Sequence, residues 1–119
     1  MNVKRRNKFN ARKTMVDSIL FHSASEAARY KILKILERAG EICNIQLQVP
    51  YHFIYNGAKI FTYYADFVYV SKKGETIIED VKSKATQKLA VYRLKKKLIE
   101  AKFGIVITEV YGIKISEVK

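Results

Sequence analysis

The sequence predicts an α/β fold, a mixed β-sheet flanked by helices in the order α-β-β-β-α-β. Three observations predict it: a capped helical segment, three strand-like segments separated by turn residues, and a second helical segment that leads into a β-branched strand. With 119 residues, 49% of them hydrophobic, the chain is long enough for one compact core and too short for two. We expect a flexible basic arm over residues 1–13 and one domain over 14–119.

The first helix is predicted between Ser23 and Gly40. Ser23 and Glu26 have the spacing of a capping box, and Gly40 stands where a helix often ends in a left-handed residue. Apolar residues at helical spacing predict the buried stripe. They are Ala28, Ile32, Ile35, Leu36 and Ala39.

Three antiparallel strands are predicted next. Over residues 42–49 apolar and polar residues alternate, which indicates a strand with one apolar face, and Pro50 ends this strand or marks an edge of the sheet. Asn56-Gly57 suits a tight hairpin turn between residues 51–55 and 58–70. A second turn over 71–75 leads into a short strand that ends near Lys82, and a polar loop follows over 83–87.

The second helix is predicted from Lys88 to Phe103, where Gly104 stops it. The segment carries many lysines. Residues 105–110 then read as a final β-branched strand.

The composition points to a polyanionic partner. There are 23 Lys and Arg against 11 Asp and Glu, a net charge of +12. Cys43, the single cysteine, cannot form an internal disulfide and is interpreted as a small buried hydrophobe. No run of 18 apolar residues occurs, so we expect a cytoplasmic protein without a membrane partner.

Two aspartates interrupt apolar strands. Asp66 lies between apolar residues on both sides, and Asp80 ends a second apolar strand. An aspartate in a strand is unfavourable, and two of them on strands joined by one short turn would lie close together. Like charges held close are stabilised by a cation between them, which predicts a divalent metal with oxygen ligands, Mg²⁺ or its substitute Mn²⁺.

Lys82 completes this group. Residues i and i+2 of a strand point to the same face, so Asp80 and Lys82 should project together and Glu79 away from them. A bulge at the strand end would exchange Glu79 and Asp80. A lysine beside an activated water can orient that water and stabilise the charge of an attacked phosphate.

In their order and spacing these residues resemble the PD-(D/E)XK nuclease superfamily. More narrowly, the chain is similar to small phage-borne endonucleases that are related to Holliday-junction resolvases. The resemblance covers roughly residues 14–103. It is carried by SEAARY (25–30), GEI (40–42), QLQ (46–48), YADF (64–67) and EDVK (79–82).

The resemblance implies a restriction-endonuclease-like core and a role for each matching residue. Asp66 would be the central metal ligand, Asp80 the second carboxylate and Lys82 the residue that orients water. Glu26 would complete the acidic cluster, although its position in the capping box gives it a purely structural alternative. Gln48 would contact substrate or support the site. Ala65 replaces the proline of the superfamily pattern.

The implied function is Mg²⁺-dependent cleavage of branched DNA by a homodimer, as a phage or prophage protein in the host cytoplasm. Phosphate contacts are expected from Arg93, Lys95 and Lys96. Arg5 and Arg6 belong to an arm that either lies along phosphates or is a solvated tail. Two alternatives stay open, a non-catalytic nucleic-acid-binding module of the same fold and a sequence-specific restriction endonuclease.

Overall fold

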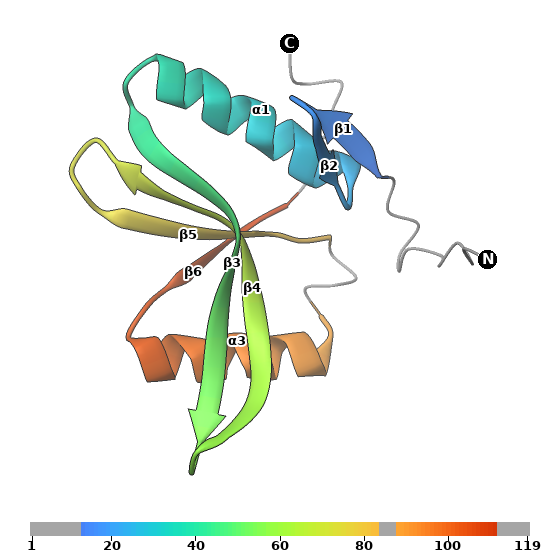
Figure 1. The fold of residues 1–119 in the computed structure, drawn as a ribbon, viewed down its shortest axis with the longest axis vertical. Coiled ribbons are helices and arrows are strands. Elements are labelled where there is room, and N and C mark those ends of the chain that lie inside the picture. Colours follow the sequence, from blue (N-terminus) through green and yellow to red (C-terminus); the bar gives the residue numbers. More distant parts are fainter. Residues whose placement is uncertain (1–12, 84–87, 112–119) are drawn as a thin grey trace.

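The computed structural model describes residues 13–83 and 88–111 and confirms an α/β fold with a mixed sheet and two helices. The four-stranded sheet has the order β3-β4-β5-β6, antiparallel except for the parallel pair β5-β6 (Figure 1). The elements in chain order are β1 (Thr14–Val16), β2 (Ile19–Phe21), α1 (Ala24–Arg38), β3 (Ile42–Tyr55), β4 (Ala58–Ser71), β5 (Thr76–Val81), α3 (Ala90–Phe103) and β6 (Ile107–Val110).

The hairpin β1-β2 was not predicted. It turns at Asp17 and Ser18, whose φ angles of 51° and 65° are left-handed and would normally be signalled by glycine or asparagine. Phe21 of this hairpin is buried and lies 5.1 Å from the ring of Tyr30 in α1. The hairpin therefore covers the start of α1 and extends its core.

The buried face of α1 differs in part from the predicted stripe. Ala28 is buried as predicted, but Ile35 is 50% exposed, and Tyr30 and Leu33 are buried in its place. Helical spacing defines two neighbouring apolar stripes here and cannot tell which of them meets the sheet. The aromatic contacts of Tyr30 with Phe21 and Phe67 select the second stripe.

The strands β3 and β4 form one long hairpin that turns at Asn56-Gly57, as predicted, with φ angles of 49° and 76°. Pro50 does not end β3, which continues to Tyr55. It is tolerated because β3 is an edge strand. Cys43 is exposed, so the prediction that it is a buried hydrophobe is wrong. It precedes Asn44, whose left-handed φ of 58° accompanies a shift in register.

This hairpin serves two cores that lie on opposite faces of β5. Its first half in β3 packs toward α1, whereas the half near the turn packs against α3 (Figure 1). Leu47 and Phe67 belong to the α1 core, but Val49 and Ala65, two residues away on each strand, belong to the α3 core. The predicted single apolar face of β3 is therefore wrong. Gln48 has a left-handed φ of 50° and interrupts the alternation.

The helix α3 ends at Gly104, as predicted, with a φ of 64°. Ile99 is its fully buried side chain and packs with Ile78 and Ile107. The return strand β6 pairs with β5 so that Asp80 lies opposite Glu109. None of the described helices is long and apolar enough to cross a membrane.

Candidate functional site

Asp66 lies at the point where the β3-β4 hairpin changes from one core to the other. The pairs Leu47 with Phe67 and Val49 with Ala65 place Gln48 opposite Asp66. The Gln48 side chain donates a hydrogen bond of 3.0 Å from Nε2 to Asp66 Oδ1. The backbone N–H of Val81 donates to Asp66 Oδ2 over 2.8 Å. Asp66, 8% exposed, is thus fixed between β3 and β5.

Asp80 is the second buried carboxylate of this region, at 1% exposure. The Tyr63 hydroxyl donates to Asp80 Oδ2, and Lys82 Nζ lies 3.2 Å from Asp80 Oδ1. Asp80 and Lys82 therefore project to the same side of β5, as the strand period predicts.

The negative charges of this region affect one another. Burial, followed by the hydrogen bond and charge of Asp80 and by the charge of Glu26, raises the pKa of Asp66 to about 8. Burial also raises the pKa of Glu26, against the lowering effects of His22 and Lys82. Three carboxyl groups thus share one region with Lys82 as a nearby cation, and this arrangement favours the protonated form of Asp66 and Glu26.

Glu79 has a different environment. It points to the α1 side of β5, where Arg29 Nε donates to Glu79 Oε1 over 2.8 Å and Arg29 Nη2 contacts Oε2. Tyr69 also donates to Glu79. Burial and this hydrogen bond raise the pKa of Tyr69 to about 12. The exchange of Glu79 for Asp80 by a bulge does not occur, because Glu79 faces away from Asp66.

Glu26 lies in the first turn of α1 and has two relations. Its backbone N–H donates to Ser23 Oγ over 3.1 Å, so Ser23 caps the helix. Its carboxyl group is partly buried and is influenced by His22, Lys82 and Asp80. The cap uses the backbone of Glu26, and the side chain is available to the acidic region.

Tyrosines that the sequence did not single out support the site. Tyr63 binds Asp80, and the Tyr92 ring lies under Lys82 Nζ at 4.5 Å from the ring centroid. The Tyr92 hydroxyl donates to Glu109 Oε2 over 2.7 Å. Local sequence gives no signal for these contacts, because they depend on how β4, α3 and β6 are placed around β5.

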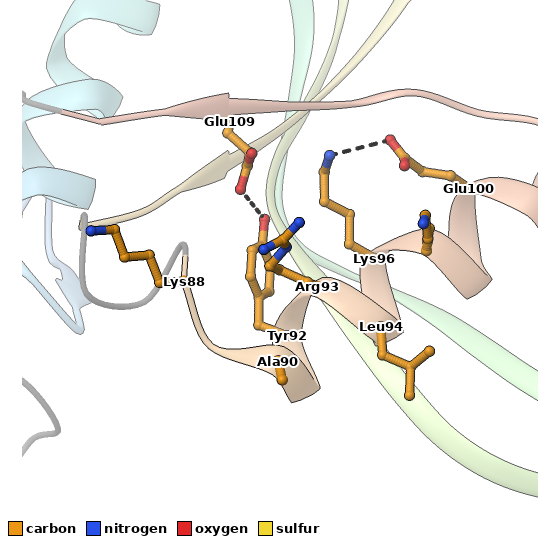
Figure 2. A pocket seen from close by; sticks show the side chains of 9 residues that line it. Lys88, Ala90, Tyr92, Arg93, Leu94, Lys96, Glu100 and Glu109 are labelled. Carbon is orange, nitrogen blue, oxygen red and sulfur yellow. Dashed lines mark hydrogen bonds and ion pairs between the residues drawn. The ribbon is translucent and has the colours of Figure 1, made fainter.

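Of the predicted DNA-contacting residues of α3, Arg93 and Lys96 border a groove of about 780 Å³ beside the site (Figure 2). Arg93 is exposed in this groove, and Lys96 lies 3.6 Å from Glu100, which partly offsets its charge. Lys95 instead lies 5.5 Å from the ring centroid of Phe61, outside the groove lining. Arg5 and Arg6 lie outside the described residues.

The donor set suits a hard divalent cation. Within residues 13–83 and 88–111, no group of three or more His, Cys, Asp or Glu is arranged around a common metal position. Mg²⁺, however, is commonly held by one or two carboxylates and keeps several water ligands. The buried pair Asp66 and Asp80 meets this requirement, and Glu26 is near enough to influence the pKa of Asp66.

The sequence matches the family described as "Protein of unknown function (DUF1064)" over residues 6–117. The match spans nearly the whole chain, and the chain belongs to this family. No curated protein matches the chain.

Proposed function

We propose that this member of the DUF1064 family is a Mg²⁺-dependent endonuclease that hydrolyses DNA phosphodiesters by attack of water. The observation that carries the proposal is that Asp66 of β4 lies beside Asp80 of β5, with Lys82 next to Asp80. Burial, together with the neighbouring Asp80, raises the pKa of Asp66 to about 8, and two buried carboxyl groups in this arrangement do not favour folding. The ammonium group of Lys82, 3.2 Å from Asp80 Oδ1, supplies a positive charge that can stabilise the negative charge of an attacked phosphate.

Asp66 and Asp80 would hold the metal directly, and Glu26 would do so directly or through water. When bound, Mg²⁺ or Mn²⁺ supplies neutralisation of these carboxylates and Lewis acidity toward water and phosphate. Gln48 fixes Asp66 by the 3.0 Å hydrogen bond to Oδ1, and Tyr63 fixes Asp80. The protein thus orients both ligands before substrate arrives.

Lys82 would orient the attacking water and stabilise the negative charge on the phosphate. Its side chain is 19% exposed, buried enough to be held in place and open enough to contact a strand that enters the site. With a cation bound at Asp80, Lys82 would be less strongly held by that carboxylate and could contact a phosphate oxygen.

The DNA strand would lie along the groove between α3 and β6. Lys88, Arg93, Lys96 and Lys97 line this groove, and Tyr92 and Glu109 border it on the side of Asp80. Contacts of this kind bind phosphate without reading base sequence. They suit recognition of DNA by shape, and by resemblance the substrate is a branched intermediate such as a Holliday junction. Symmetric resolution needs two nicks, so the working form would be a C₂ homodimer.

The test is cleavage of a four-way junction and a linear duplex with shared sequences, in Mg²⁺, Mn²⁺ or EDTA. We expect nicking of the junction with either metal and none in EDTA. Asp66→Asn and Lys82→Met should each reduce cleavage by roughly a thousandfold or more while junction affinity changes little. The matched controls are Asp17→Asn and Lys73→Met, which alter exposed residues in turns.

Two outcomes would contradict the proposal. If the wild-type protein binds DNA but never cuts it in either metal, the chain is a non-catalytic binding module. If it cuts junction and linear duplex equally at one fixed motif, it is a sequence-specific restriction endonuclease, and the junction preference is wrong.

A further inference from the structure

Lys82 is held on two sides. Its backbone N–H donates to the carbonyl oxygen of Val110 over 2.8 Å, which fixes the chain beside β6. Its ammonium group contacts Asp80 at 3.2 Å and the Tyr92 ring at 4.5 Å from the centroid. A lysine side chain has four flexible carbons, so its ammonium group reaches a defined position only when packing restricts it.

Tyr92 is itself fixed by β6. Its hydroxyl donates to Glu109 over 2.7 Å, and Figure 2 shows the side chain extending from α3 toward Glu109. Burial, the hydrogen bond to Glu109 and the charge of Asp80 raise the pKa of Tyr92. The phenol therefore stays protonated and remains a donor. A chain of contacts thus runs from β6 through α3 to Lys82.

We propose that Tyr92 is a positioning residue that holds the Lys82 ammonium group for cleavage, with Glu109 fixing the ring. The inference rests on the proposed function in assigning Lys82 to cleavage. The contact between ring and ammonium is a cation–π interaction, strongest when the cation is partly desolvated, as it is here. With a cation bound at Asp80, the ion pair between Lys82 and Asp80 would weaken, whereas the contact with the Tyr92 ring does not depend on that carboxylate.

The first arm of the test is independent of cleavage. In the full chain with labelled lysines, ring current from Tyr92 should shift the side-chain resonances of Lys82 upfield of the other lysines. A Lys82→Arg variant assigns the signals. We expect the shift to persist in Tyr92→Phe, which keeps the ring, and to vanish in Tyr92→Leu. The control Tyr55→Leu removes an exposed tyrosine at the hairpin end and should change nothing. An unshifted Lys82 in the wild-type protein overturns the proposal.

The second arm is turnover of the four-way junction. Tyr92→Leu should lower kcat by about a hundredfold, the effect of misplacing a reacting group by about 1 Å, with KM changed little. Tyr92→Phe should restore most of kcat. Glu109→Gln keeps the ring and a side-chain oxygen that can accept from the Tyr92 hydroxyl, so its kcat should be at least that of Tyr92→Phe, and both variants guard against misfolding of Tyr92→Leu.

The two failures are distinguishable. If Tyr92→Leu loses the Lys82 shift but keeps its kcat, the positioning role is wrong and the nuclease remains. If the wild-type protein does not cleave at all, the proposed function is wrong and the positioning role falls with it, whatever the spectra show of the contact.

Discussion

Glu79 and Asp80 are neighbours on β5, both almost fully buried, and they differ in what surrounds them. On the α1 side, Glu79 receives two hydrogen bonds from Arg29 and one from Tyr69, so its charge is matched. On the other side, Asp80 meets Lys82 and Tyr63 but also lies beside Asp66. The strand β5 thus buries Glu79 with a matching cation on one face, and Asp80 beside a second carboxyl group on the other.

The different surroundings of Glu79 and Asp80 distinguish a carboxylate buried for folding from one that folding does not explain. A buried carboxylate with a bidentate arginine is compensated and specifies how α1 docks on the sheet. A buried carboxylate beside another carboxylate destabilises the fold, and packing gives no reason to keep it. This contrast is the reason for proposing a ligand cation at Asp66 and Asp80.

The largest expected effect breaks the balanced pair. Arg29→Leu leaves Glu79 buried without its cation, so we expect the free energy of unfolding to fall by about 3–5 kcal/mol, measured by urea denaturation. The double variant Arg29→Leu with Glu79→Leu should recover much of this loss, because no charge remains to be compensated. If Arg29→Leu alone is as stable as the wild type, the compensation of Glu79 is not what holds α1.

The buried carboxyl groups around Asp66 should make the thermal stability of the metal-free protein depend on pH. In the folded state the pKa of Asp66 is about 8, against 3.8 as its ordinary value. The folded state holds the proton longer than the unfolded state, so this contribution is complete below pH 3.8 and is lost as pH rises through 8. We expect the melting temperature in EDTA to fall by several degrees between about pH 5 and pH 8.

Asp66→Asn is the matched control, because it cannot ionise and its curve should be flatter over the same range. Mg²⁺ added at the upper end of the range should raise the melting temperature of the wild type but not of the variant. If melting temperature depends on pH in the same way in the wild type and in Asp66→Asn, the pKa of Asp66 is not raised in the folded protein.

The smallest expected effect separates the two roles of Glu26, one in the cap of α1 and one in the acidic cluster. Ser23→Ala removes the cap oxygen and should lower the free energy of unfolding by about 1 kcal/mol without changing cleavage of the junction. Glu26→Gln keeps the backbone donor of the cap, so its stability should change little while its cleavage falls. If instead Glu26→Gln loses stability and keeps cleavage, Glu26 belongs to the cap alone.

Sequence reasoning reached the features that depend on local chemistry. Asn56-Gly57 gave the hairpin turn and Gly104 the end of α3, because few residues adopt left-handed backbone. Strand parity also placed Lys82 beside Asp80. The buried face of α1 and the contacts of Tyr63 and Tyr92 were missed. They depend on long-range packing, which short-range patterns do not record.

The left-handed Gln48 has one more consequence. Strict alternation without Gln48 and Asp66 would still direct Leu47 and Phe67 to one face, and Val49 and Ala65 to the other. Gln48 and Asp66 thus form one additional residue pair between β3 and β4, and neither core requires this pair. The pair lies where the hairpin passes from one core to the other, so the fold does not depend on the side chains of the candidate site. A relative that had lost both residues would keep the shape and give up the carboxylate.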